Sequence, residues 1–348
     1  MKVIFFVEDA KLNGGTEILA RNLACTLEES GVACRLVSAV DCRREGPLRK
    51  VLTKLATDWN ADWIVCHTYD LCADIPTDGP WRTVQVFNWS VRGYEAAYLR
   101  GVNAKPFVKR VLSRIKFEIL RYRWHRALVK FAKLVVLTDA GKSEILAANR
   151  KVREGQLVTI PDPLMRTEDS KTLSSLTNKR VVFVGRLSAE KGVMRLLRIW
   201  RKIRKQRPDY TLAIYGVGSM QREMEAYVAA ENLQGVEFKG YCNDLEGIYA
   251  TADLCLMTSD TEGFGMVLIE AMYYGVPCVS FDCPVSPKEI IGAAGVTVPC
   301  FDENAYAEEV VKLLTDENRL MACQRAAIAR ARDFYINEVI RKWNAILT

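Results

Sequence analysis

Short apolar runs alternate with amphipathic stretches along the whole chain. The apolar runs are bounded by turn residues and predict buried strands, whereas stretches such as 16–30 and 193–204 have the apolar spacing of helices. This alternation predicts parallel sheets with crossover helices. The predicted strands are 3–7, 33–37, 63–66, 83–87 and 134–137 in the first half, and 180–184, 211–215, 235–238, 254–257, 277–281 and 295–298 in the second.

The segment 161–175 interrupts this pattern because it is rich in Pro, Ser and Thr, which is typical of a linker. We therefore expect an α/β protein of two doubly wound, Rossmann-like domains that face each other across a cleft. Ligands of such sheets bind at the carboxyl ends of the strands. The predicted parts are an N-terminal domain at 1–163, a linker at 164–178, a C-terminal domain at 179–332 and a returning helix at 333–348.

Composition narrows the class of protein. A chain of 348 residues suffices for two domains, and 49% apolar residues let each domain bury a core. No run approaches 18 continuous apolar residues, so we expect no transmembrane helix, and the first residues read as a strand rather than a signal peptide. Eleven Cys without C-x-x-C pairs suit reduced thiols in a cytoplasmic protein, and two His without metal-type spacing argue against a zinc site.

Glycine turns follow two of the predicted strands. The turn at 13–16 (Asn-Gly-Gly-Thr) contains Gly14 and Gly15, and a helix is predicted directly after it. Backbone N–H groups at such a helix start can approach an anion, although a plain tight turn explains the glycines equally well. Gly216 and Gly218 repeat this geometry in the second half of the chain.

Two cations follow the strand predicted at 180–184. Arg186 and Lys191 project from this loop, with Glu190 beside them. A guanidinium fork and a movable ammonium can together neutralise a diphosphate. The alternative is a solvated charged loop that binds no ligand.

Two glutamates lie in or just before an apolar run at 266–274. Glu270 falls inside the helix predicted at 266–274, and Glu262 lies in the glycine loop before it. A lone carboxylate is costly to bury without partners. Free N–H groups at the start of this helix can bind a phosphate. The alternative is that Glu270 belongs to a buried polar network and Glu262 is solvated.

Taken in order, these motifs resemble those of the retaining glycosyltransferases of family 4, which have the two-domain GT-B fold. The matching segments are Gly185-Arg186…Glu190-Lys191-Gly192, Tyr215-Gly216-x-Gly218 and Glu262-Gly-Phe-Gly…Glu270-Ala, the last of which has the spacing of the family's E-x7-E motif. The resemblance is dense from about 180 to 292 and fainter in the N-terminal half. It implies that a last helix near 337–347 returns to the N-terminal domain.

The resemblance also implies roles for the matching residues. Glu270 would accept both vicinal hydroxyls of a nucleotide ribose, and Arg186 and Lys191 would hold the diphosphate. Glu262 would contact the donor sugar near its reacting end. The other implied nucleotide-sugar contacts are Gly14, Gly15, Gly216, Gly218, Tyr241, Cys242, Gly263, Phe264 and Gly265. The resemblance implies no metal and no cofactor, with the nucleotide sugar as co-substrate.

Two departures from the family pattern concern the substrates. Many members carry a His after a strand of the N-terminal domain, where this chain has Asn88, which can hydrogen-bond a sugar but cannot titrate near neutral pH. His67 also ends a predicted strand, and it could line the acceptor side or be a satisfied structural residue. The stretch 282–291 resembles members that use uridine-diphosphate sugars, except for Ser286 in place of a glycine, so we expect a UDP-hexose or UDP-N-acetylhexosamine donor.

The stretch 100–133 is strongly basic and contains one acid, Glu118. Apolar residues recur there at helical spacing, and a basic amphipathic helix at 105–133 suits an anionic membrane surface. One alternative is a core helix whose basic face is solvated. Another is a helix that binds nucleic acid, but no nucleic-acid recognition motif accompanies the charge. We expect a peripheral contact with the inner face of the cytoplasmic membrane and no nucleic-acid partner.

The motifs and the resemblance together predict a retaining, metal-independent glycosyltransferase. It would move a hexose or N-acetylhexosamine to a glycan or lipid-linked acceptor in cell-surface polysaccharide or lipopolysaccharide synthesis. The alternatives are a nucleotide-sugar epimerase on the same fold, which would need acids and His placed for chemistry at C2, and a catalytically silent nucleotide-binding protein.

Overall fold

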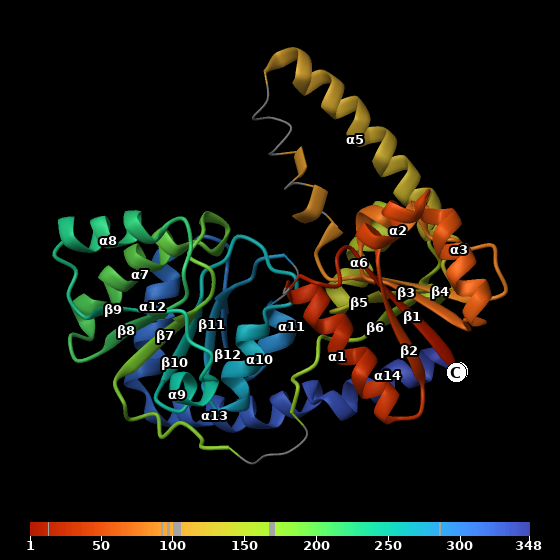
Figure 1. Ribbon diagram of the computed structural model, residues 1–348. Helices are drawn as coiled ribbons and strands as arrows, with labels where there is room; N and C mark the ends of the chain where they lie inside the picture. The colour runs from red at the N-terminus through yellow and green to blue at the C-terminus, as the bar shows by residue number, and fades with distance from the viewer. Residues whose placement is uncertain (13, 92, 96–97, 100–105, 167–170, 285–286) are drawn as a thin grey trace. The chain divides into compact units, whose positions relative to one another are not determined.

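The structure is a computed structural model of residues 1–348. It describes all of them except 13, 92, 96–97, 100–105, 167–170 and 285–286, so Asn13 and Ser286 of the motifs lie outside the described residues. The chain forms two compact units (Figure 1). The first unit comprises Met1–Asp162 and Val339–Thr348, and the second comprises Pro163–Glu338.

The first unit is built on a six-stranded parallel sheet in the order β2-β1-β3-β4-β5-β6. Its strands are β1 (Lys2–Val7), β2 (Ala33–Ser38), β3 (Trp63–Cys66), β4 (Arg82–Phe87), β5 (Lys133–Val136) and β6 (Leu157–Thr159). The strand order reverses between β1 and β3, which makes the carboxyl edge there the expected ligand site of a doubly wound sheet.

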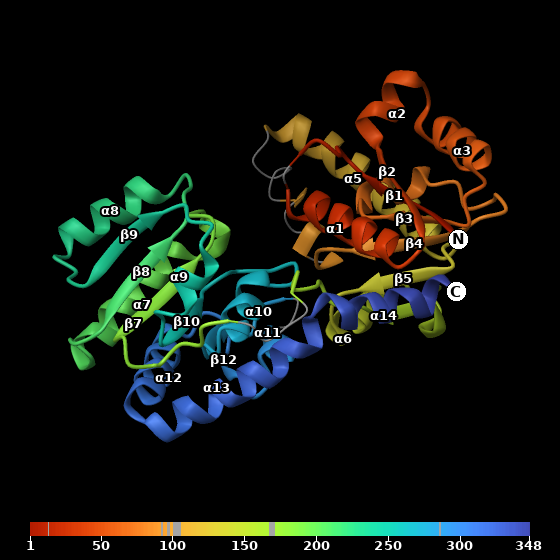
Figure 2. The same cartoon turned by 60° about the horizontal axis from the view of Figure 1, so that its bottom comes forward.

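Helices flank this sheet (Figures 1 and 2). They are α1 (Gly15–Glu29), α2 (Ala39–Glu45), α3 (Leu48–Trp59), α5 (Phe107–Leu128) and α6 (Asp139–Ala148), with short 3-10 turns η1 (Tyr69–Asp74) and η2 (Glu154–Gln156). Capping side chains fix two of the starts: the hydroxyl of Ser38 accepts from the amide of Asp41, and that of Thr138 accepts from the amide of Gly141.

The second unit is built on another six-stranded parallel sheet, in the order β12-β11-β10-β7-β8-β9. Its strands are β7 (Arg180–Val184), β8 (Thr211–Tyr215), β9 (Val236–Gly240), β10 (Leu254–Met257), β11 (Cys278–Phe281) and β12 (Gly295–Val298). Every residue of β10 and β11 is buried, which explains their unbroken apolar character. The order reverses between β7 and β10, so this edge is the expected ligand site of the second unit.

The helices of the second unit begin at side-chain caps in several places. Asp244, Asp302 and Asp316 each accept a hydrogen bond from a backbone amide of the turn that follows. The helices are α7 (Val193–Gln206), α8 (Gln221–Ala230), α9 (Leu245–Tyr249), α10 (Met266–Tyr273), α11 (Pro287–Ile291), α12 (Glu303–Thr315) and α13 (Glu317–Ala331), with 3-10 turns η3 (Ala189–Lys191) and η4 (Arg332–Phe334). A last helix, α14 (Ile336–Leu347), begins in this unit and continues into the first.

The chain path differs from the prediction at the linker and agrees with it in a last helix that returns to the first unit. Residues 164–178, predicted as a linker, belong to the second unit, where the amide of Ser174 donates to Tyr274 O and its hydroxyl donates to Ala252 O. Helix α14 begins in the second unit, and Val339–Thr348 belong to the first, where Trp63 Nε1 donates to Leu347 O at 2.7 Å. In the described part of the chain, no helix is both long and apolar enough to cross a bilayer.

Candidate active site

The predicted donor residues of the second unit lie in loops at the carboxyl edge of its sheet. The loop after β7 carries Arg186 and Lys191, and the loop after β10 carries Glu262. Because β7 and β10 are hydrogen-bonded neighbours at the reversal of strand order, these two loops meet at the expected ligand site.

Lys191 and Glu262 form an ion pair across this edge. Lys191 Nζ lies 2.8 Å from both Oε1 and Oε2 of Glu262, although 71 residues separate the two in the sequence. The Glu262 side chain is 8% exposed, whereas that of Lys191 is 26% exposed. The structure therefore brings together two residues that the sequence motifs predicted separately, and it leaves the ammonium accessible from solvent.

The backbone around this pair is closely packed. Gly192 follows Lys191 with a φ of 64°, and a Cβ on it would lie 2.0 Å from the carbonyl oxygen of Thr258. The hydroxyl of Thr258 donates to Lys191 O at 3.0 Å. Glycine at 192 is therefore what lets the β7 and β10 loops approach closely enough for the ion pair to form.

Glu262 is held from three sides. Besides Lys191, its carboxylate accepts a hydrogen bond from the hydroxyl of Ser259, and its amide donates to Pro284 O at 2.8 Å. Buried carboxylates require partners of this kind. The solvated alternative considered for Glu262 does not fit its 8% exposure.

Arg186 is placed differently from Lys191. Its side chain is 71% exposed, and its nearest acid oxygen is Oε1 of Glu190 at 3.9 Å. Such an exposed pair contributes little to stability, so the guanidinium is available to a ligand. The ordered arginine nearby is Arg195 of α7, which donates to Thr258 O and to Oδ1 of Asp260, both at 2.9 Å. Sequence reasoning missed Arg195, because only the packing of α7 against the β10 loop identifies it as a positioning residue.

Gly216 and Gly218 serve close packing of backbone. A Cβ on Gly216 would lie 1.9 Å from the carbonyl oxygen of Gly185, and one on Gly218 would lie 2.2 Å from that of Leu187. The amide of Gly216 donates to Gly240 O at 2.7 Å and is therefore already used. These glycines set the β8 loop against the β7 loop that carries Arg186 and Lys191.

Glu270 lies inside the apolar helix α10 and has a hydrogen-bond partner, Tyr249, at the end of α9. The hydroxyl of Tyr249 lies 3.3 Å from Oε2 of Glu270 and 3.4 Å from Val267 O. Burial raises the pKa of Glu270 above its ordinary value, with the Tyr249 hydrogen bond acting in the opposite direction. A carboxylate with one weak hydrogen bond keeps most of its acceptor capacity for a ligand.

The residues between the two acids have separate structural roles. Gly265 is the N-cap of α10, with a φ of 92°. The Phe264 ring is 3% exposed and packs edge-on against Phe334, with ring centroids 5.7 Å apart. Gly263 is partly exposed. Only the backbone of Phe264 can therefore face a ligand.

Tyr241 and Cys242 lie apart from these residues. They follow β9, the edge strand of the sheet, and two strands separate β9 from β10. Tyr241 is 73% exposed. The structure thus does not bring them into contact with Glu262 or Glu270, but they remain on the same carboxyl edge.

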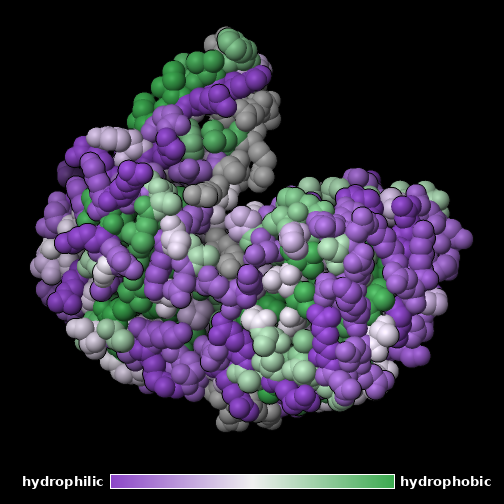
Figure 3. All heavy atoms as spheres, turned by 180° about the vertical axis from the view of Figure 1, so that it is seen from behind, coloured by the Kyte–Doolittle hydropathy of each residue, from purple (hydrophilic) through white to green (hydrophobic). Residues whose placement is uncertain are grey.

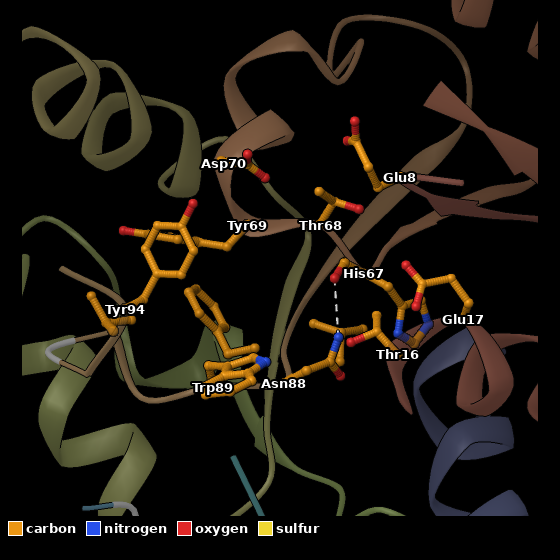
Figure 4. A pocket seen from close by; sticks show the side chains of 13 residues that line it. Glu8, Thr16, Glu17, His67, Thr68, Tyr69, Asp70, Asn88, Trp89 and Tyr94 are labelled. Atoms are coloured by element: carbon orange, nitrogen blue, oxygen red, sulfur yellow. Dashed lines mark hydrogen bonds between the residues drawn. The ribbon is translucent and has the colours of Figure 1, made fainter. Parts of the chain in front are cut away.

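The predicted acceptor-side residues of the first unit line a pocket at the carboxyl edge of its sheet (Figure 4). The pocket has a volume of about 590 Å³, including space open to solvent. His67 follows β3 and Asn88 follows β4, and Asn88 Nδ2 donates to His67 O at 3.0 Å. In Figure 4 the His67 ring lies on the side of Thr16 and Glu17, opposite Tyr69 and Tyr94.

His67 is buried without a hydrogen-bond partner for its ring. It is 4% exposed and stacks on Phe5, and both Nδ1 and Nε2 lack a partner. Burial lowers the pKa of His67 to about 4, so the ring is neutral near pH 7. Buried ring nitrogens without a protein hydrogen bond favour the acceptor-side role of His67 over the satisfied structural one.

Gly14 and Gly15 lie beside this pocket at the start of α1. Gly14 is the N-cap, and a Cβ on it would meet the flexible carboxylate of Glu17. A Cβ on Gly15 would meet nothing within 4 Å. The fold of the described residues does not require glycine at 15, and the open space above it leaves room for a ligand.

Within the residues that the structure describes, no group of three His, Cys, Asp or Glu side chains lies close enough together to hold a metal ion. The β7 and β10 loops at the carboxyl edge of the second sheet carry Arg186, Glu190, Lys191, Asp260 and Glu262.

The two sheet topologies identify the class of fold. The solved structure of Anabaena Alr3699/HepE in complex with UDP aligns over 100% of this chain and 99% of its own, with a TM-score of 0.78 and 16% identity. Likeness at this level of identity establishes the fold, which is the GT-B fold of two doubly wound domains.

A family match covers most of the second unit. Residues 165–330 match the family described as Glycosyl transferases group 1. An uncharacterized glycosyltransferase of Haemophilus influenzae is 26% identical over 99% of each chain. The amylovoran biosynthesis glycosyltransferase AmsD of Erwinia amylovora is 32% identical over 169 residues. The matched segment covers 48% of this chain and 48% of that relative.

Proposed function

We propose that the protein is a retaining, metal-independent glycosyltransferase of family 4. It transfers a hexose or N-acetylhexosamine from a UDP-sugar to a glycan or glycolipid in cell-surface polysaccharide synthesis. The observation that carries this proposal is the Lys191–Glu262 pair at the reversal of strand order, with Arg186 beside it on the same edge. The UDP bound in the HepE structure and the amylovoran role of AmsD support the donor and the product class.

The proposed chemistry places positive charge where negative charge develops. As the bond between sugar and diphosphate breaks, the sugar becomes oxocarbenium-like and the leaving diphosphate gains charge. Lys191 and Arg186 stabilise that charge from the β7 loop, and the amides at the start of α10 add further donors. Fixed cations of this kind are most effective when they are already in place, and Glu262 holds Lys191 in position.

Glu262 and Glu270 have different proposed roles. Glu262 lies in the loop, paired with Lys191, and contacts the donor sugar near its reacting end. Glu270 lies inside α10 and accepts the two ribose hydroxyls, a geometry that suits the two oxygens of a carboxylate. Tyr241 and Cys242 present main chain to the base. Gly14 and Gly15 approach the phosphate or the acceptor.

The donor is tested by nucleotide binding followed by turnover. In calorimetry we expect UDP to bind at least tenfold more tightly than GDP or ADP, and in hydrolysis assays we expect one UDP-sugar of a panel to be cleaved. The exposed-site variant Glu223→Gln on α8 serves as a control and should bind UDP as the unmodified protein does. Equal binding of the three nucleotides would refute the UDP donor, and tight UDP binding without turnover of any sugar would favour a catalytically silent protein.

The acceptor side is tested at His67. Because its ring nitrogens are buried and unpaired, we expect His67→Phe to leave the free energy of unfolding unchanged or to raise it by about 1–3 kcal/mol. The same change should raise the acceptor KM by about tenfold, since it removes a ligand hydrogen bond of about 1.4 kcal/mol, with donor KM unchanged. Thermal denaturation and steady-state kinetics measure both. Loss of stability with unchanged kinetics would show that His67 serves the fold alone.

A further inference from the structure

Helix α5 has two apolar faces, and the first unit buries only one of them. Phe117, Trp124 and Leu128 are each at most 2% exposed and pack into the core. The other face carries large apolar side chains at the i, i+3, i+4 spacing of a helical stripe. These are Val111 (43% exposed), Leu112 (62%), Ile115 (54%), Ile119 (57%) and Tyr122 (63%).

This stripe contains more exposed apolar side chains than is usual for one helix on a protein surface. Single exposed apolar residues are common on proteins, but five on consecutive turns of one helix mark an interaction surface. In Figure 1 the N-terminal half of α5 extends away from the rest of the first unit, and Figure 3 shows hydrophobic side chains gathered on this projecting segment. Phe107, in the first turn, is 74% exposed.

Cations flank the stripe along its length. Lys109, Lys116 and Arg123 are exposed and seven residues apart, so they lie in a line along one edge of the stripe. Arg114 is exposed near the other edge. The single acid of α5, Glu118, is paired with Arg121 at 2.7 Å. The face that would meet a partner is therefore apolar along its middle and positive at its sides.

A cation-lined pocket lies at the C-terminal end of the same stripe. Its volume is about 590 Å³, part of it open to solvent, and Tyr122 lines it together with Arg49, Arg123, Arg126 and Lys130. Asp78 pairs with Arg49 and Asp74 with Arg123, but no acid is among the described residues that line the pocket. Four cations around one hollow suit a phosphate group.

We propose that the outer face of α5 docks this protein on an anionic bilayer. The apolar stripe enters the boundary between head groups and acyl chains, the flanking cations meet anionic head groups, and the pocket at Arg126 and Lys130 holds a lipid phosphate. The helix lies in the surface and does not cross it, because its 22 residues include seven Lys and Arg.

The charges favour a bilayer over a second copy of the chain. Two copies of α5 packed stripe to stripe would bring the like charges of Lys109 and Lys116 close together, and the one acid of each helix, Glu118, is already paired with Arg121. An anionic surface instead provides opposite charge along both edges of the stripe. Neither argument depends on the proposed transferase activity, so the docking surface can be tested independently of it.

The test is flotation of the full chain with vesicles of phosphatidylcholine alone or mixed with phosphatidylglycerol. We expect binding to the anionic vesicles and little to the neutral ones. Ile115→Glu/Ile119→Glu should abolish binding because it places two acids in the stripe. Arg126→Gln/Lys130→Gln should weaken binding about 30-fold, since each cation near an anionic surface contributes about fivefold.

A matched control distinguishes the effect of these particular cations from that of the total positive charge of the protein. Arg150→Gln/Lys151→Gln removes one exposed Arg and one exposed Lys elsewhere on the first unit and should bind within a few fold of the unmodified protein. Circular dichroism checks that each variant is folded. Equal binding to neutral and anionic vesicles, or unchanged binding of Ile115→Glu/Ile119→Glu, would overturn the proposal. The proposal would also be overturned if the unmodified protein did not float with vesicles but sedimented as a dimer, and Ile115→Glu/Ile119→Glu converted that dimer to monomers.

Discussion

Replacing Lys191 by Met lowers the rate of sugar transfer by about 10²–10³-fold, the usual effect of removing one group that stabilises developing negative charge. Lys191 is the ordered cation of the β7 loop, held 2.8 Å from both oxygens of Glu262. Met keeps the length of the side chain without the charge. The measurement is kcat with a cleaved UDP-sugar, compared with Lys205→Met, which removes an exposed lysine on α7 and should be neutral.

Lys191→Met also leaves the Glu262 carboxylate buried without its cation. Breaking such a pair costs about 3 kcal/mol of unfolding free energy, so a loss of activity could have a purely structural cause. The double variant Lys191→Met/Glu262→Gln separates the two explanations, because a neutral amide no longer needs a cation. We expect the double variant to regain most of the stability but none of the activity. Recovery of turnover in the double variant would mean that Lys191 serves only to neutralise Glu262.

Glu262→Gln alone completes this cycle. Lys191 is 26% exposed and can extend to water, so the loss of stability should be smaller than for Lys191→Met. Turnover should fall, while the Kd for UDP changes little, because the proposed partner of Glu262 is the sugar. The two single changes should be strongly non-additive in stability, since the side chains contact each other directly.

The predicted fold rests on patterns that are local in the sequence. Eleven short apolar runs predicted eleven strands, because a buried parallel strand reads as a continuous apolar segment. The twelfth strand, β6 (Leu157–Thr159), was missed, since three residues give too short a run to distinguish from a loop. The segment 164–178 looked like a linker because its Pro, Ser and Thr content does not reveal that Ser174 is bonded to Tyr274 and Ala252.

The candidate site shows where sequence patterns stop being informative. The positions of Arg186, Lys191 and Glu262 after strands could be predicted, because carboxyl ends of parallel strands share one edge. The Lys191–Glu262 pair and the role of Arg195 could not, since both depend on contacts between loops more than 60 residues apart. Likewise, α5 was expected at 105–133, but its periodicity does not say which of two apolar faces the core covers.

Replacing Glu270 by Gln weakens UDP binding by about 10–100-fold, because hydrogen bonds to a charged group are worth about 1.5–3 kcal/mol. The carboxylate offers two acceptor oxygens to the ribose hydroxyls, whereas the amide offers one oxygen and a donor. Tyr249 can still donate to the remaining oxygen, so its contact at 3.3 Å is preserved. Stability should be equal or higher, since the variant buries no charge, and calorimetry with UDP and thermal denaturation measure the two effects.

The pH dependence of binding provides a second and independent readout of Glu270. Burial raises the pKa of this carboxyl, and in the proposed role its ionised form binds the ribose. As the pH falls toward that raised pKa, the protonated fraction grows and UDP affinity falls. UDP itself titrates, so the ratio of the two Kd values, unmodified protein to Glu270→Gln, isolates the contribution of Glu270 at each pH. This ratio should approach one at acidic pH. A ratio that stays constant, together with lower stability of the variant, would show that Glu270 serves only as the buried partner of Tyr249 and does not bind the ribose.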